Sequence, residues 1–176
     1  AGIFAATGQS CVAGSRLIVH RSIKNRLLTV LKAKAEAIRL GAPDSRDTDM
    51  GPLATLRQRD HIEAVVKASI DAGAKLVTGG GVPANAGSDY YYAPTILDCS
   101  GTKAPAVTTE LFGPVLAAVD FETEEEAVAL ANSTPYGLAS GVFTRNLSRA
   151  HRMSRDIRAG VVWINTYRAI SPMAPF

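Results

Sequence analysis

Hydrophobic residues recur at helical spacing in two long segments of the first half of the chain. In the first segment, expected to begin with Ser22 as its N-cap and to end before Gly41, one apolar stripe consists of Ile23, Leu27, Val30, Leu31, Ala35 and Ile38. In the second, over residues 56–72, the stripe consists of Ile62, Val65, Val66, Ser69 and Ile70. Repeats of three and four residues place these side chains on one helix face, so both segments are predicted to be amphipathic helices.

Short apolar runs bounded by polar or glycine-containing segments predict strands. They cover residues 16–20, 75–78, 92–97, 115–121, 139–144 and 161–164. Pro94 should make the third run irregular or an edge strand, because proline cannot donate to a sheet ladder. Two further helices are expected, one after a capping box of Thr123 and Glu126 and one after Asn146. The second of these should carry four residues inward: Leu147, Ala150, Met153 and Ile157.

Helices and strands thus alternate along the whole chain, and this order predicts the fold class. Strands separated by helices favour an α/β protein, here a three-layer domain with a largely parallel sheet flanked by helices. No internal repeat, low-complexity tract or interior linker interrupts the pattern. Residues 1–176 are therefore predicted to form a single domain.

Composition narrows the class of protein. With 47% hydrophobic and 20% charged residues, the chain is typical of a globular protein in water. No apolar run approaches the roughly 18 residues of a membrane span, and no charged leader precedes Phe4, so neither a membrane partner nor a signal peptide is expected. Two cysteines favour the reducing cytoplasm. The net charge is +3, and no aromatic residues interleave with the arginines of the densest basic stretch, residues 145–158, so nucleic acid is not an expected partner.

The candidate nucleophile is Cys11, which lies among small residues after a Gly-Gln pair and before the first predicted strand. Small neighbours on a short turn leave a thiol open to a substrate, an arrangement suited to covalent catalysis. The reactive form is the thiolate, and no histidine lies within a few residues to take the proton. From these residues alone, a small buried hydrophobic cysteine is the favoured interpretation.

Four motifs together change the interpretation of Cys11. Residues 4–16 read Phe-x-x-x-Gly-Gln-x-Cys-x-Ala-Gly-Ser-Arg, and residues 110–115 read Glu-Leu-Phe-Gly-Pro-Val. Residues 132–139 read Asn-Ser-Thr-Pro-Tyr-Gly-Leu-Ala, and residues 160–165 read Gly-Val-Val-Trp-Ile-Asn. In this order and at this spacing, they resemble the NAD(P)-dependent aldehyde dehydrogenase superfamily, and the resemblance runs from residue 1 to residue 176.

The resemblance implies a catalytic role for Cys11. The matching cysteine of the family attacks the aldehyde carbonyl, and the resulting thiohemiacetal loses hydride to NAD or NADP. The thioester that remains is usually hydrolysed to a carboxylic acid. The backbone N–H of that cysteine is one of the donors to the oxyanion, as such an intermediate requires.

The resemblance also implies roles for other residues. Glu110 would bind the nicotinamide ribose hydroxyls, Phe112 would pack near the nicotinamide, and Gln58 would contact the cofactor from a helix. The substrate pocket would be bordered by Ser10, Val12 and Phe176. From the residues alone, Glu110 is equally a solvated loop acid, Phe112 and Phe176 are packing residues, and Gln58 is an exposed helix residue.

Further residues with reactive or ligating side chains suggest no second site. His20, His61 and His151 lie on different predicted elements and match no metal-ligand spacing, so no metal is expected. Residues 79–81 are three glycines but lack the Lys-Ser/Thr of a phosphate-binding loop, which favours a turn. Cys99 is interpreted as a structural thiol at a strand end.

The resemblance further implies a piece of a longer enzyme. The family's nucleotide-binding domain, which binds most of the NAD(P), its general-base glutamate, its oxyanion asparagine and its oligomerisation strands have no counterpart in the 176 residues. The chain is therefore expected to be a catalytic domain truncated at both ends and inactive alone, and the full-length protein a homodimer or homotetramer acting on an aldehyde.

Three alternatives remain open. An acylating dehydrogenase would pass the thioester to coenzyme A or phosphate. A non-catalytic protein would reuse the fold, although such relatives typically lose the cysteine that is present here. A stand-alone thiol hydrolase would need one of the three histidines close to Cys11 in space.

Overall fold

The computed structural model describes residues 2–84, 87–170 and 173, and its chain divides into two compact units, Ala1–Asp120 and Phe121–Phe176. Both are mixtures of helices and strands, and each contains a parallel strand pair, so the predicted α/β fold class is confirmed. The prediction of a single domain stays a prediction.

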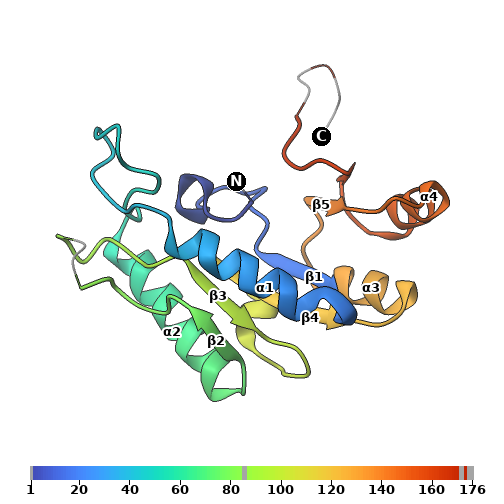
Figure 1. Cartoon of the computed structure of the whole chain (residues 1–176), viewed down its shortest axis with the longest axis horizontal. Helices are drawn as coiled ribbons and strands as arrows, with labels where there is room; N and C mark the ends of the chain where they lie inside the picture. The colour runs from blue at the N-terminus through green and yellow to red at the C-terminus, as the bar shows by residue number, and fades with distance from the viewer. Residues whose placement is uncertain (1, 85–86, 171–172, 174–176) are drawn as a thin grey trace. The chain divides into compact units, whose positions relative to one another are not determined.

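The first unit is built on a four-stranded sheet in the order β1-β4-β3-β2 (Figure 1). Its strands are β1 (Arg16–His20), β2 (Lys75–Thr78), β3 (Thr95–Asp98) and β4 (Val115–Phe121). β3 and β4 are parallel, and β2 is antiparallel to β3. The helices are α1 (Arg21–Glu36) and α2 (Leu56–Asp71), with two short 3-10 helices, η1 (Ala5–Gly8) and η2 (Pro105–Val107).

α1 packs on one face of this sheet. Its buried Leu28 and Ala35 join Ile96, Leu116 and Ala118 of β3 and β4 in one hydrophobic cluster. β3 and β4 are buried along almost their whole length, as expected for strands inside a parallel arrangement. The rigid interior thus lies directly beneath the segments that enter and leave β1 and β4.

Three sequence predictions for this unit are corrected in detail. α1 begins at Arg21 and its N-cap is His20, whose ring nitrogen Nδ1 accepts from the Ser22 backbone N–H at 3.2 Å. The imidazole therefore does the capping that was expected of Ser22. The inner face of α1 is also rotated, because Ile23 and Val30 are 43% and 48% exposed while Leu28 is buried.

The third correction concerns β3, which was expected to be irregular or an edge strand over residues 92–97. It begins after Pro94 and lies inside the sheet, between β4 and β2. The proline precedes the ladder and removes no donor from it, and the next residue, Thr95, donates its N–H to the Pro114 carbonyl at 2.8 Å. In α2, Ile62, Val66 and Ser69 are buried as predicted, whereas Ile70 is exposed.

The second unit holds α3 (Glu124–Ala131), β5 (Ala139–Val142), α4 (Leu147–Asp156) and β6 (Val161–Ile164), with β5 and β6 parallel. The predicted capping box of Thr123 and Glu126 and the Asn146 cap are confirmed. Leu147 was expected to face inward but is 73% exposed. It is the first residue of α4, and helical side chains lean toward the N-terminus, so no preceding turn encloses it.

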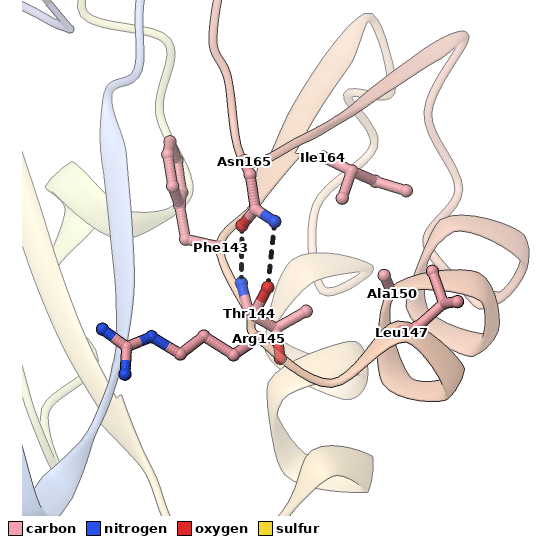
Figure 2. A pocket seen from close by; sticks show the side chains of 7 residues that line it. All are labelled: Phe143, Thr144, Arg145, Leu147, Ala150, Ile164 and Asn165. Atoms are coloured by element: carbon pink, nitrogen blue, oxygen red, sulfur yellow. Dashed lines mark hydrogen bonds between the residues drawn. The ribbon is translucent and has the colours of Figure 1, made fainter.

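β5 ends two residues earlier than predicted because a side chain takes over its hydrogen bonds. The Asn165 amide accepts from the Thr144 N–H and donates to the Thr144 carbonyl, both at 2.9 Å (Figure 2). Phe143 and Leu147 line a pocket together with this pair (Figure 2). No helix among the described residues is long and apolar enough to cross a membrane.

Candidate functional site

Cys11 lies on the turn between η1 and β1, and its side chain is exposed. The turn is closed by a hydrogen bond from the Ala13 N–H to the Ser10 carbonyl at 2.9 Å. Ser10 is half-buried, and Val12 is buried. The turn thus anchors itself through Val12 and presents the neighbouring thiol to solvent, so the interpretation of Cys11 as a buried hydrophobic residue does not hold.

The backbone amide of Cys11 is available to a ligand. Within the described residues, its N–H donates no hydrogen bond to another group of the chain. A backbone donor next to an exposed thiol suits an oxyanion that forms on the carbon attacked by the sulfur.

Two side chains tie the segment before Cys11 to the loop that leads into α2. The Thr7 hydroxyl donates to the Gly51 carbonyl at 3.1 Å, and the Gln9 side-chain oxygen accepts from the Ala54 N–H at 2.9 Å. Both bonds span more than forty residues of sequence. Hydrogen bonds to the loop before α2 therefore hold the segment that leads into the cysteine turn.

Cys99 provides the contrast within the same unit. It follows β3, is 1% exposed, and lies 3.9 Å from the Leu97 carbonyl through its sulfur. Burial, with the negative charge of Asp98 as a further cause, raises the pKa of its thiol to about 12. A neutral buried thiol is unreactive, so Cys99 has the environment of a structural cysteine.

The Glu110–Val115 motif forms a loop between η2 and β4 that exposes two of the predicted residues. Glu110 is exposed, and Phe112 is 41% exposed on a backbone with φ of 50°. Leu111 between them is buried and fixes the loop to the interior. A carboxylate and an aromatic ring are thus presented together at the surface.

The cysteine segment and the Glu110–Val115 loop meet at two glycines. A Cβ built on Gly8 would lie 2.0 Å from the Gly113 carbonyl oxygen, so their backbones are in direct contact. Gly8 is three residues before Cys11, and Gly113 is three residues after Glu110. The structure therefore brings the two motifs together although about 100 residues separate them.

Gln58, on the first turn of α2, contacts the same loop. Its side-chain nitrogen donates to the carbonyl of Leu111 and, at 3.3 Å, to that of Phe112. Four of the predicted site residues, Cys11, Gln58, Glu110 and Phe112, thus lie in one region of the first unit. Their chemical roles stay predictions, and Phe176 lies outside the described residues.

The other candidates are not drawn into this region by hydrogen bonds. No hydrogen bond joins Cys11 to a histidine anywhere in residues 2–84, 87–170 and 173. Within the same ranges, no group of three or more His, Cys, Asp or Glu side chains could hold a metal ion. The stand-alone thiol hydrolase therefore gains no support from the geometry.

The sequence reasoning missed the supporting residues Thr7, Gly8 and Gln9. The motif contains the Gly-Gln pair, but the resemblance implies roles only for Ser10, Cys11 and Val12, which follow it. A glycine directly before a polar side chain, both at fixed distances from a nucleophile, was the available signal. It indicates a close backbone approach and a side chain used for anchoring.

Comparison with known proteins agrees with this arrangement. The profile of the aldehyde dehydrogenase family matches residues 1–176. A (Z)-2-((N-methylformamido)methylene)-5-hydroxybutyrolactone dehydrogenase of Acinetobacter baylyi is 61% identical over 100% of this chain, and betaine aldehyde dehydrogenase 1 of Rhizobium meliloti is 42% identical over 99% of it. The crystal structure of PnpE in complex with nicotinamide adenine dinucleotide superposes with a TM-score of 0.95 at 41% identity over 99% of the chain.

The site of this chain consists of an exposed cysteine turn in contact with a Glu-Leu-Phe-Gly-Pro loop, both beside the sheet of the first α/β unit. The family match identifies the class: the chain belongs to the aldehyde dehydrogenase family. It spans 36% of the length of each of these two curated relatives and 36% of the PnpE chain.

Proposed function

We propose that these residues form the cysteine-bearing catalytic part of an NAD(P)-dependent aldehyde dehydrogenase. The observation that carries the proposal is the contact of Gly8 with Gly113, because it joins the exposed Cys11 turn to the Glu110–Phe112 loop. The substrate would be an aldehyde and the product a carboxylic acid. Family membership and the NAD complex of PnpE support this function.

In the proposed reaction, the Cys11 thiolate attacks the carbonyl carbon of the aldehyde. A C–S bond forms, the π electron pair moves to oxygen, and the Cys11 N–H donates to the resulting oxyanion. NAD(P)+, held at its nicotinamide end by Glu110 and Phe112, would supply the acceptor for the hydride of that carbon. The C=O bond then re-forms as a thioester on Cys11, and water cleaves the C–S bond to release the acid and the thiol.

The residues of the loop fit the nicotinamide end of the cofactor. An exposed carboxylate at Glu110 can accept hydrogen bonds from two ribose hydroxyls at once. The exposed ring of Phe112 offers a flat apolar surface for a neighbouring ring. Both are proposed to orient the ring toward the carbon held on Cys11. We also propose that Ser10 and Val12 border the pocket that binds the aldehyde.

The second candidate is an acylating dehydrogenase, in which coenzyme A or phosphate takes the place of water. The same thioester on Cys11 serves both reactions. The exposed sulfur favours both equally, and product analysis distinguishes a free acid from an acyl thioester or acyl phosphate. A non-catalytic protein is disfavoured by the free, exposed thiol of Cys11.

The first test is the relative reactivity of the two cysteines. Iodoacetamide at neutral pH, followed by peptide mapping, is expected to modify Cys11 at least about tenfold faster than Cys99, because the buried thiol stays protonated. Labelling after denaturation should reach both. Equal slow labelling of both native thiols would contradict the proposal.

The second test uses the complete open reading frame that encodes these residues. Cys11→Ser should abolish NAD(P)H formation from aldehydes, a loss of at least about a thousandfold in kcat/KM, since the hydroxyl is a far weaker nucleophile. Cys99→Ser serves as the matched control and should retain most of the activity of the soluble protein. Activity that survives Cys11→Ser would remove Cys11 from the mechanism.

A further inference from the structure

Phe112 occupies a backbone conformation that aromatic residues rarely adopt. Its φ of 50° lies in the left-handed region, which costs free energy for any residue with a Cβ. Such conformations persist only where surrounding contacts hold them, and they are frequent at functional sites. The contacts around Phe112 therefore indicate what places its ring at the surface.

The first contact is the pair of hydrogen bonds from Gln58. The side-chain nitrogen of Gln58 carries two hydrogens, and it donates to the carbonyl of Leu111 and to the carbonyl of Phe112. A side-chain NH2 group can donate to two carbonyls at once, which neither a carboxylate nor an alkyl group can do. The Gln58 amide nitrogen thus binds the loop at two points.

The second contact lies one helical turn further along α2. A Cβ on Gly113 would lie 2.2 Å from the Ile62 Cδ1 atom, so the backbone after Phe112 rests directly on the fully buried Ile62 side chain. Gln58 and Ile62 are four residues apart and therefore project from one face of the helix. This face of α2 therefore contacts the backbone both before and after Phe112.

The same stretch of chain also holds the cysteine turn. Its residues 51 and 54 are the partners of Thr7 and Gln9, and Thr55 caps α2 by accepting from the Gln58 N–H at 3.1 Å. Residues 51–62 thus form one continuous segment that contacts the nucleophile turn at its beginning and the Phe112 loop at its end.

We propose that Gln58 is a positioning residue, whose amide holds the Phe112 backbone in its left-handed conformation and so sets the ring of Phe112 relative to the Cys11 turn. The catalytic meaning of this role rests on the proposed function; the structural role does not. It is distinct from the direct cofactor contact that the resemblance implies for Gln58, because the amide nitrogen donates to the loop, whereas a contact with ribose hydroxyls would use the amide oxygen as acceptor.

The structural role is tested by hydrogen exchange followed by mass spectrometry on the 176-residue chain without cofactor. Gln58→Leu and Gln58→Glu should each speed amide hydrogen exchange in residues 108–115 at least about fivefold, since loss of the hydrogen bonds from the Gln58 amide loosens the loop. Exchange in the middle of α2 should stay unchanged, which excludes global unfolding. Arg57→Leu, an exposed neighbour on the same turn, is the matched control and should behave like the parent chain.

The catalytic meaning is tested in the complete open reading frame. Gln58→Leu should lower kcat at least about tenfold and change KM for NAD(P)+ less than about threefold, because a misplaced ring impairs hydride transfer more than binding. Unchanged exchange in both Gln58 variants overturns the proposal, and so does a rise in KM for NAD(P)+ with unchanged kcat, which a direct cofactor contact would produce. If the parent enzyme forms no NAD(P)H while exchange still responds, the proposed function fails and the structural role of Gln58 stands.

Discussion

The steric fit between Gly8 and Gly113 is the tightest contact at the scale of single residues. Gly8 has φ of 71°, and an added Cβ would lie 2.0 Å from the Gly113 carbonyl oxygen. Gly8→Ala should therefore lower the free energy of unfolding by about 3 kcal/mol or more, the sum of a left-handed alanine and an overpacked contact. Denaturant unfolding of the purified chain measures this change.

Gly101 offers the matched control for this substitution. Its φ is 70°, nearly the same, but no atom lies within 4 Å of a Cβ built on it. Gly101→Ala should cost only the backbone term, about 1 kcal/mol. Equal losses in the two variants would mean that the contact between the two motifs contributes nothing to the cost at Gly8.

Tyr92 carries a buried hydroxyl that finds no hydrogen-bond partner among the described residues. Burial, together with the negative charge of Glu63, raises the pKa of the Tyr92 phenol from 10.0 to about 12. Tyr92→Phe should raise the free energy of unfolding at pH 7 by about 1 kcal/mol, because an unsatisfied buried hydroxyl is removed without a loss of volume.

The pH dependence gives this prediction a second measurement. Between pH 10 and pH 12 the unfolded phenol ionises while the folded one stays protonated, so the parent chain loses stability as the pH rises. The Tyr92→Phe variant should lose less stability than the parent chain over this range, and the loss that remains comes from other groups with a raised pKa, such as the Cys99 thiol. A destabilised variant at pH 7, or the same loss at high pH, would contradict the assignment.

At the scale of elements, Lys24 joins α1 to the ends of β3 and β4. Its ammonium lies 3.2 Å from carboxylate oxygens of both Asp98 and Asp120, and it donates to the Ser100 hydroxyl at 3.0 Å. Burial alone would raise the pKa of each carboxyl, but hydrogen bonds from Lys24 and Ser100 hold both pKa values below 3.8. The side chains are mostly buried, so loss of the ammonium would leave two carboxylates without their charged partner, which costs more than the loss of a surface pair.

Lys24→Met should accordingly lower the free energy of unfolding by about 1–2 kcal/mol at pH 7. Because the folded pKa values of Asp98 and Asp120 are lowered, their contribution is present above the ordinary aspartate value and is lost as the pH falls below 3.8. The variant should show a flatter loss of stability in that range. Denaturant unfolding at pH 7 and at pH 3 measures both effects.

Lys32→Met is the control on the same helix. Lys32 forms an exposed pair with Glu36 at 3.8 Å, and such pairs contribute little. Its removal should change stability by less than about 0.5 kcal/mol at either pH. A loss as large as that of Lys24→Met would assign the effect to the helix rather than to the link with the strand ends.

At the scale of the whole molecule, we expect the 176 residues alone to form no measurable NAD(P)H from aldehydes. The chain spans 36% of the length of its curated relatives, and within the described residues no side chain forms a hydrogen bond with Cys11. The absorbance of reduced nicotinamide, followed with the purified chain and a set of aldehydes, measures this. The complete open reading frame is the positive control, and turnover by the 176 residues alone would refute the expectation.

Much of the secondary structure follows from local pattern. The strands β1, β2, β4 and β6 have the predicted bounds, and α2 differs from its prediction by one residue, because apolar periodicity and end signals are properties of short stretches. The His20 cap of α1 could not be predicted in the same way. Its imidazole competes with the more usual Ser22 for the role, and only the path of β1 into the helix decides between them.

The sequence by itself determined the family, the fold class and the two motifs that hold Cys11 and Glu110, since these depend on which residues stand next to one another. Only the tertiary structure decided that Gly8 contacts Gly113 and that the Gln58 amide donates hydrogen bonds to the loop of Phe112. These contacts join segments 50 to 105 residues apart, and a chain can bring such segments together only by packing its helices on its sheet. Periodicity reports which face of an element is buried, but not which distant backbone it will meet there.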